Sequence, residues 1–212
     1  MVLQNVNITI GVKTIRFHQV FNQTFIYKNT MKKIILLVGG SGTGKDLVAN
    51  IMHNEHTIRK IVSYTTRPIR DGEMNGREHY FLPKISNNHY KETVEDIFAY
   101  TLYGENEYFT TVSQINEMLT LNDEVIYIID EAGVEHIKES GNSLNLDVVL
   151  INITRDVARR LRSGVSNERM ERDSSRIKSK IVYDYVINNN GTIDALKKRI
   201  GDIVKSIRKN GR

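Results

Sequence analysis

Seven residues have the spacing of a loop that holds nucleotide phosphates: Gly39-Gly40-Ser41-Gly42-Thr43-Gly44-Lys45. The apolar run Ile34–Val38 precedes them, and apolar residues at helical spacing follow. Glycines allow the backbone to wrap closely around a phosphate, so that successive N–H groups face its oxygens. Lys45 is suited to supply a mobile cation to the β- and γ-phosphates. We therefore expect Gly39 through Lys45 to bind ATP.

The residue after this lysine departs from the usual pattern. That position normally carries Ser or Thr, whose hydroxyl binds Mg²⁺, and here it is Asp46. A carboxylate can bind Mg²⁺ directly or through water. Asp130, at the end of the apolar run Val125–Asp130, is a second candidate ligand, with helix capping as its alternative role. We expect a Mg²⁺ cofactor, with Asp46 in the ATP site and with Asp46 and Asp130 as the candidate metal ligands.

A second phosphate-binding segment is indicated by Arg67 and Arg70, which flank Pro68. Planar guanidinium groups hold phosphate through two parallel hydrogen bonds, which lysine cannot reproduce. The nearby hydroxyls, including that of Ser63, add further donors. These residue types indicate a second segment that binds phosphate.

The segment from Ser63 to Phe81 closely resembles the monophosphate-binding segment of guanylate kinases, including its Gly72-Glu73-x-x-Gly76 pattern. The resemblance extends from Lys33 to the C-terminal helix and includes Asn106–Thr111. It implies a nucleoside monophosphate kinase that transfers the γ-phosphate of ATP to a ribo- or deoxynucleoside monophosphate, with GMP or dGMP as the leading acceptor. The residues that it implies at the acceptor site are Ser63, Arg67, Arg70, His79, Tyr80, Tyr108, Thr110 and Asp130.

The same resemblance implies the catalytic groups. Lys45 and Arg67 belong to the two phosphate-binding segments, while Arg160 and Arg172 belong to an arginine-bearing lid. Tyr183–Asn189 resembles the strand and loop beside the adenine of ATP, which adds Asn188 and Asn189 to the ATP site.

Three departures from the family pattern concern the acceptor. Ala99 aligns with the family's guanine-reading Glu, His79 with a phosphate-contacting Tyr, and Ile128 with the first carboxylate of an Asp/Glu-x-Asp pair. We expect phosphate recognition to be retained and base recognition to be altered, with Glu105 and Glu107 as possible substitutes for the missing carboxylate.

The apolar runs alternate with helical patterns after Lys33, which predicts an α/β fold of the P-loop NTPase type, a parallel sheet flanked by helices. Residues 1–30 are expected to be an extension outside the core. Residues 31–212 are expected to form one domain, with its core at 31–63 and 116–212, a monophosphate-binding insert at about 64–115 and a lid at about 162–172. The strands are expected at Ile34–Val38, Ile61–Ser63, Val125–Asp130, Val148–Ile153 and Tyr185–Ile187, with a loop at 163–169.

Composition limits the other classes of function. The chain has 212 residues, a net charge of +5 and no cysteine, which excludes disulfides and thiolate chemistry. It has no apolar run of membrane-spanning length. We expect a cytoplasmic monomer or homodimer whose partners are nucleotides rather than nucleic acid or a membrane. Two alternatives stay open: a kinase for another nucleotide or a phosphorylated ribose, and a non-catalytic guanylate kinase-like binding module.

Overall fold

The computed structural model describes residues 6–10, 13–17, 32–139, 146–175 and 181–210. Its centre is a parallel sheet of five strands in the order β11-β10-β3-β9-β4. The strands are β3 (Lys33–Val38), β4 (Arg59–Lys60), β9 (Glu124–Ile128), β10 (Asp147–Thr154) and β11 (Tyr185–Asn188). In register, Leu36 of β3 pairs with Leu150 and with Tyr127. The expected parallel α/β sheet is confirmed.

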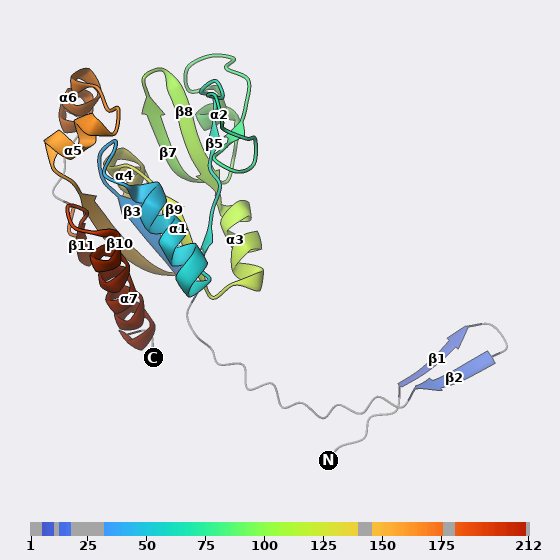
Figure 1. The fold of residues 1–212 in the computed structure, drawn as a ribbon. Coiled ribbons are helices and arrows are strands. Elements are labelled where there is room, and N and C mark those ends of the chain that lie inside the picture. The colour runs from blue at the N-terminus through green and yellow to red at the C-terminus, as the bar shows by residue number, and fades with distance from the viewer. Residues whose placement is uncertain (1–5, 11–12, 18–31, 140–145, 176–180, 211–212) are drawn as a thin grey trace.

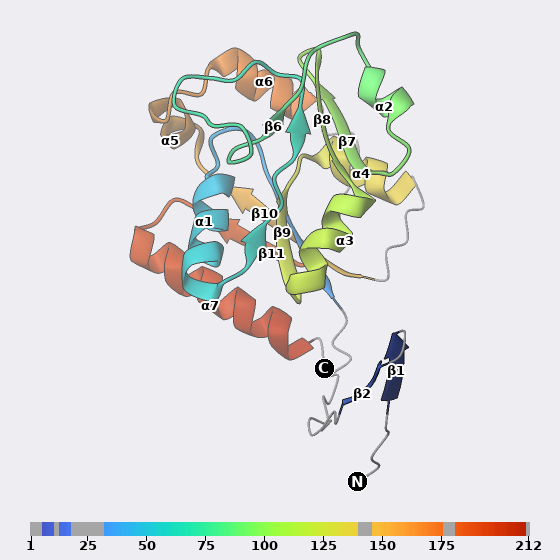
Figure 2. The same cartoon turned by 90° about the vertical axis from the view of Figure 1, so that its right-hand side faces the viewer.

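Alternating side chains of β3 serve two separate cores, as expected for a strand buried on both faces. Ile35 and Leu37 pack with α1 (Lys45–His56) and α7 (Ile193–Asn210) on one face of the sheet. Ile34, Leu36 and Val38 contribute to the core on the other face. That core also includes residues of two further helices, α3 (Val112–Leu121) and α4 (Glu131–Glu139). Figures 1 and 2 show these helices on the two sides of the sheet.

A smaller sheet of four strands, in the order β6-β5-β8-β7, forms the insert. Its strands are β5 (Tyr64–Thr65), β6 (Tyr80–Phe81), β7 (Ile97–Tyr103) and β8 (Asn106–Thr111). The short helix α2 (His89–Thr93) lies between β6 and β7 in the sequence. Buried Glu107 of β8 accepts a hydrogen bond from the backbone N–H of Tyr90, 3.0 Å away, and so ties α2 to the sheet.

Two further helices, α5 (Val157–Arg162) and α6 (Asn167–Ser175), follow β10. In Figure 1 they lie on the opposite side of the phosphate loop from β7 and β8. They contain the arginines that the sequence assigns to a lid.

Two sequence expectations about local structure are wrong. Residues 61–63 are not a strand, because Arg59–Lys60 pairs with β9 and the chain then crosses to the smaller sheet at Tyr64–Thr65. The loop expected at 163–169 ends earlier, since α6 begins at Asn167. Ser166 accepts a hydrogen bond from the N–H of Arg169 at 3.3 Å, which caps this helix.

The N-terminal part contains a hairpin of β1 (Val6–Ile10) and β2 (Lys13–Phe17), paired antiparallel. The separation of residues 1–30 from the core stays a prediction. Among the described residues, no helix is long and apolar enough to cross a membrane.

Candidate active site

A cleft of about 710 Å³ lies where the phosphate loop, the insert and the lid helices meet. This volume is typical of small-molecule sites. The loop follows the carboxyl end of β3, which is the edge where open parallel sheets bind ligands. The cleft is lined by these residues that the sequence predicts: Gly39, Gly40, Ser41, Gly42, Lys45, Asp46, Ser63, Arg67, Arg70, His79, Tyr108, Asp130 and Arg160.

The phosphate loop is fixed by its own contacts. The Lys45 ammonium donates to the carbonyl oxygens of Gly39 and Gly40, at 2.6 and 3.0 Å. Gly44 has a φ of 98°, and a Cβ there would lie 2.3 Å from the side-chain nitrogen of Asn189. That nitrogen donates to the Thr43 carbonyl at 2.8 Å, so the Asn189 side chain stabilises the loop backbone at Thr43.

The charge of Lys45 is balanced by surrounding carboxylates. Burial lowers the pKa of its ammonium, and the negative charges of Asp46 and Asp173, followed by those of Glu131 and Asp130, act against that shift. A phosphate bound in the loop would add further negative charge and favour the ammonium form.

Arg67 is held in a two-point ion pair with Glu73. Its two terminal nitrogens lie 2.9 Å from the two oxygens of the Glu73 carboxylate. One of these nitrogens also donates to the carbonyl of Pro68 at 2.7 Å. The guanidinium therefore has a fixed plane before any ligand arrives, which reduces the ordering required on binding.

His79 joins the same wall of the cleft. Its Nδ1 lies 2.8 Å from the hydroxyl oxygen of Ser63, and its ring meets that of Tyr108 edge to face at 5.8 Å between centroids. Burial, followed by the nearby positive charge of Arg67, lowers the pKa of His79. Because Arg67, Arg70 and Tyr108 line the same cleft, this wall can hold a phosphate through several donors.

The two candidate metal ligands differ in their surroundings. The Asp46 side chain is 79% exposed, and one of its oxygens lies 3.7 Å from the Lys60 ammonium. Asp130 instead accepts hydrogen bonds from the Thr101 hydroxyl at 2.6 Å and from the Gly133 N–H at 2.9 Å. Asp130 thus also has the helix-capping role, at the start of α4. The described residues contain no cluster of three His, Asp or Glu side chains that could hold a metal ion.

The lid contacts the phosphate loop directly. Arg160 of α5 donates to the carbonyl of Ser41 at 2.7 Å and pairs with Asp173 of α6 at 3.1 Å. Asp173 in turn accepts the Ser41 backbone N–H at 2.6 Å. Arg172 lies within α6, but its side chain is outside the described part of the structure.

Comparison with known proteins shows the family to which this chain belongs. Residues 31–206 match the family model described as guanylate kinase. The chain belongs to the guanylate kinase family.

Individual members of the family cover most of the chain. The chain is 30% identical over 185 residues to the guanylate kinase of Prochlorococcus marinus (strain MIT 9312), covering 82% of this chain and 98% of the relative. It is 31% identical over 189 residues to that of Buchnera aphidicola subsp. Baizongia pistaciae, covering 84% and 88%. The crystal structure of guanylate kinase from Anaplasma phagocytophilum superposes with a TM-score of 0.62 at 25% identity, covering 84% of this chain and 86% of that one.

Several residues assigned to the site by resemblance to the guanylate kinase family do not line the cleft. Thr110 is fully buried, and its hydroxyl donates to Gln114 within the insert. The Tyr80 ring packs against that of Tyr64 in a tilted arrangement, with 5.2 Å between ring centroids. Of the residues assigned to the ATP site, Thr43, Gly44, Asn188 and Asn189 also lie outside the lining of the cleft.

The expected substitutes for the guanine-reading carboxylate do not line the cleft either. Glu105 pairs with Lys84 at 3.1 Å on the surface. Glu107 is buried among α2 and β7, where it also accepts a hydrogen bond from the Tyr100 hydroxyl at 3.2 Å. Ala99 does line the cleft.

Sequence reasoning assigned no role to Glu73, Thr101, Tyr103 or Asp173, all of which line the cleft. Glu73 had a signal, because it stands in the Gly-Glu-x-x-Gly pattern beside two arginines. Asp173 had none, since its partners Ser41 and Tyr103 are distant in the sequence.

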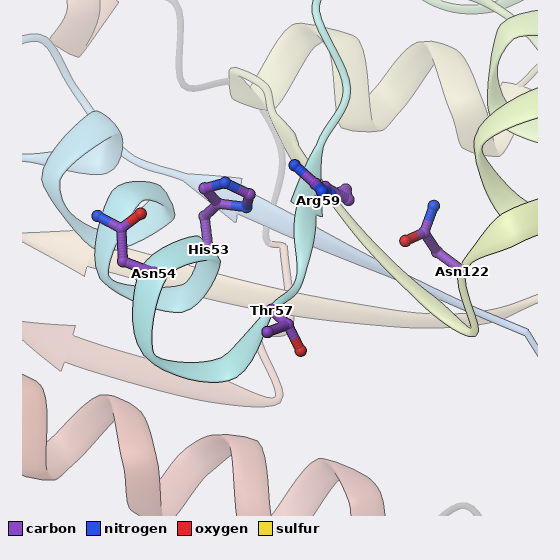
Figure 3. Close-up of a pocket in the computed structure, with 5 residues that line it drawn as sticks. All are labelled: His53, Asn54, Thr57, Arg59 and Asn122. Atoms are coloured by element: carbon purple, nitrogen blue, oxygen red, sulfur yellow. The ribbon is translucent and has the colours of Figure 1, made fainter.

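A second hollow lies at the C-terminal end of α1, and Figure 3 shows its lining. The side chains are those of His53, Asn54, Thr57, Arg59 and Asn122. Because the phosphate loop adjoins the N-terminal end of α1, this hollow is separate from the cleft.

Proposed function

We propose that the protein is an ATP-dependent nucleoside monophosphate kinase whose acceptor is GMP or dGMP. The observation that carries this proposal is the position of two phosphate-binding walls in one cleft. The phosphate loop with Lys45 forms one wall, and Arg67 with His79 lies on the other. The names of the family's members support the same acceptor.

The reaction needs position and positive charge rather than covalent chemistry by the protein. Lys45 and the loop N–H groups would bind the phosphates of ATP, and Arg67 and Arg70 would hold the acceptor's phosphate. Arg160, already against the loop, would stabilise charge on the transferring group, together with Arg172. Closure of the lid would exclude water, which otherwise hydrolyses ATP.

We also propose Mg²⁺ as the cofactor. The exposed carboxylate of Asp46, next to Lys45 in the cleft, is a suitable oxygen ligand for this ion. Asp130, which also lines the cleft, would be the second ligand, although one of its oxygens already accepts two hydrogen bonds. Bound Mg²⁺ would neutralise charge on the ATP phosphates. We further propose a cytoplasmic location, which suits nucleotide substrates and a cysteine-free sequence.

The base is expected to be read less strictly than in a protein with a carboxylate at position 99. Guanine presents N1–H and a 2-amino group as donors, and Ala99 offers no acceptor to them. Asp130 remains as a carboxylate that can accept one such bond. We therefore propose that GMP or dGMP is a substrate with weaker preference over other monophosphates.

Kinetics of ADP release with GMP, dGMP, AMP, dTMP and CMP test this proposal. Activity should be highest with the guanine nucleotides, with discrimination below the ~10⁴-fold that a fully hydrogen-bonding site achieves. Arg67→Ala should lower kcat/KM for every acceptor similarly, since the phosphate is common to all. If the protein binds ATP but forms no ADP in the presence of any acceptor, the non-catalytic alternative is favoured. If it phosphorylates only a nucleotide other than GMP or dGMP, the proposed acceptor is rejected.

A further inference from the structure

The lid contributes a carboxylate to the phosphate loop. Oδ2 of Asp173 lies 2.6 Å from the backbone nitrogen of Ser41, and Oδ1 lies 3.4 Å from the Ser41 hydroxyl. The Asp173 side chain is only 15% exposed, so this contact is protected from water. A short bond from a backbone N–H to an ionised oxygen is also how such loops hold phosphate.

The carboxylate is held there from two further sides. Arg160 donates to Oδ2 at 3.1 Å, and the hydroxyl of Tyr103, on β7 of the insert, donates to Oδ1 at 3.3 Å. Asp173 therefore links the lid, the phosphate loop and the insert. The same contact engages Arg160, the arginine that we assign to the transferring phosphate.

A phosphate of ATP and the Asp173 carboxylate cannot share this position. Both are anionic acceptors, and the Ser41 N–H at 2.6 Å from one oxygen has no second hydrogen for another. Two negative charges a few ångströms apart in a partly buried site repel each other strongly. The carboxylate also packs closely on the loop, because a Cβ at Gly40 would lie 3.2 Å from Oδ2.

We propose that Asp173 is an internal competitor of ATP for the phosphate loop. It holds the lid on the empty loop, lowers the affinity for ATP, and is displaced when the phosphates enter. Its displacement releases Arg160 from one ion pair and makes that guanidinium available to the transferring phosphate. This inference rests on the proposed function, because it takes ATP as the ligand of the loop.

Calorimetry of the full chain with Asp173→Asn and Asp173→Ala tests the proposal, using Mg–ATP and, separately, ATP with a chelator. Both variants should bind ATP about tenfold more tightly than the unaltered chain in both conditions, which corresponds to about 1.4 kcal/mol. Unchanged or weaker binding would overturn the proposal. Loss of affinity only with Mg–ATP would overturn it too, because it would make Asp173 a metal ligand.

Glu131→Gln is the matched control. Glu131 lines the same cleft and acts electrostatically on Lys45, so its substitution removes an equal charge there. It should change ATP affinity by about twofold or less, given the modest energies of unpaired nearby charges. An effect as large as that of Asp173→Asn would mean that the total negative charge around Lys45, and not competition for the loop, sets the affinity for ATP.

Hydrogen exchange of the ligand-free chain provides a readout independent of ATP. The Ser41 amide should exchange at least several-fold faster in Asp173→Asn than in the unaltered chain. Equal protection in the two would contradict the contact. ATP binding by neither chain would reject the proposed function and this inference with it, whereas equal ATP binding by both would reject this inference alone.

Discussion

Glu73 positions Arg67 through two parallel hydrogen bonds of 2.9 Å between the carboxylate oxygens and the guanidinium nitrogens. Glu73 also accepts the backbone N–H of Arg70 at 2.9 Å, so one carboxylate contacts the Arg67 side chain and the Arg70 main chain. These hydrogen bonds, first among them those from Arg67, hold the pKa of Glu73 below its usual value. The arrangement fixes the orientation of the Arg67 guanidinium at the wall of the cleft.

The first prediction concerns this pair. Glu73→Gln should raise the KM for the acceptor about tenfold with a smaller change in kcat, because Arg67 loses its charged, two-point partner. Glu78→Gln is the matched control, since Glu78 pairs with Arg77 in the same loop. A lower KM in Glu73→Gln would show that Glu73 competes with the phosphate for Arg67 instead of positioning it.

The pair also gives a dependence of stability on pH. The pKa of Glu73 is lowered in the folded protein, so its ionised carboxylate stabilises the fold. This contribution to the unfolding free energy is fully present above the pKa of a Glu carboxyl in the unfolded chain, about 4.3, and is lost as the pH falls through the pKa in the folded protein. The difference in unfolding free energy between the unaltered chain and Glu73→Gln should therefore shrink below about pH 4. Urea unfolding at pH 7 and pH 3.5 measures it, and a constant difference would contradict the ion pair.

The second prediction concerns Lys45. Lys45→Ala should lower turnover at least ~100-fold, about 2.7 kcal/mol of transition-state stabilisation. Its melting temperature should fall by only a few degrees, because the two hydrogen bonds from the ammonium to loop carbonyls contribute little net stability. The exposed Lys198→Ala on α7 serves as the control for charge loss. Retention of more than about a third of the activity by Lys45→Ala would reject the kinase assignment.

The third prediction concerns His79. Its pKa is lowered in the free protein by burial and by the positive charges of Arg67 and Lys60, with Glu73 and Asp46 acting in the opposite direction. A bound phosphate favours the imidazolium, so acceptor binding should take up a proton and strengthen as the pH falls below 7.

His79→Gln separates this effect from the titration of the phosphate itself. The variant should bind the acceptor several-fold more weakly at pH 6, as expected from losing one charge-assisted hydrogen bond, with a smaller difference at pH 8. Calorimetry in buffers of different ionisation enthalpy counts the protons taken up. His136→Gln is the control, because the pKa of His136 is also lowered, chiefly by burial, and this residue does not line the cleft. Equal proton uptake by His79→Gln and the unaltered chain would contradict the prediction.

The fourth prediction distinguishes two neighbouring asparagines. Asn189→Ala should raise the KM for ATP about fivefold and leave the acceptor KM unchanged, because its side chain supports the Thr43 carbonyl behind the phosphate loop. Asn188→Ala is the matched comparison, since Asn188 is exposed and is the last residue of β11, where it pairs with Thr154. A larger effect from Asn188→Ala would place its side chain against the adenine and assign Asn189 a lesser role.

Much of the site follows from contiguous sequence. The loop Gly39–Lys45 and the segment Ser63–Phe81 are short stretches whose residue types directly specify backbone shape and phosphate donors. The apolar runs at 34–38 and 148–153 predict buried parallel strands, and β3 and β10 confirm them within one residue at each end. These features depend on local chemistry, which a single sequence displays.

The sequence predicted secondary structure less well where a short segment could pair with either of two neighbouring elements. Residues 61–63 are apolar enough for a strand, but whether they pair is decided by the larger sheet on one side and the insert on the other. Ser166 capped a helix one turn earlier than the polar composition of 163–169 suggested. Tertiary pairing decided the first case and a local helix cap the second, and each outweighed a preference of only about a kcal/mol.

Only the tertiary structure decided which carboxylates face the cleft. Glu107 turns into the insert because neighbouring residues of a strand point to opposite sides, and its neighbour Tyr108 lines the cleft. Asp173 reaches Ser41 across 132 residues of sequence, a pairing that depends on how α6 packs over the phosphate loop. Sequence alone therefore indicated the family and the two segments that we expect to bind phosphate, because their chemistry is local. The side chains that contact those segments from other elements were set by packing, because their partners are distant along the chain.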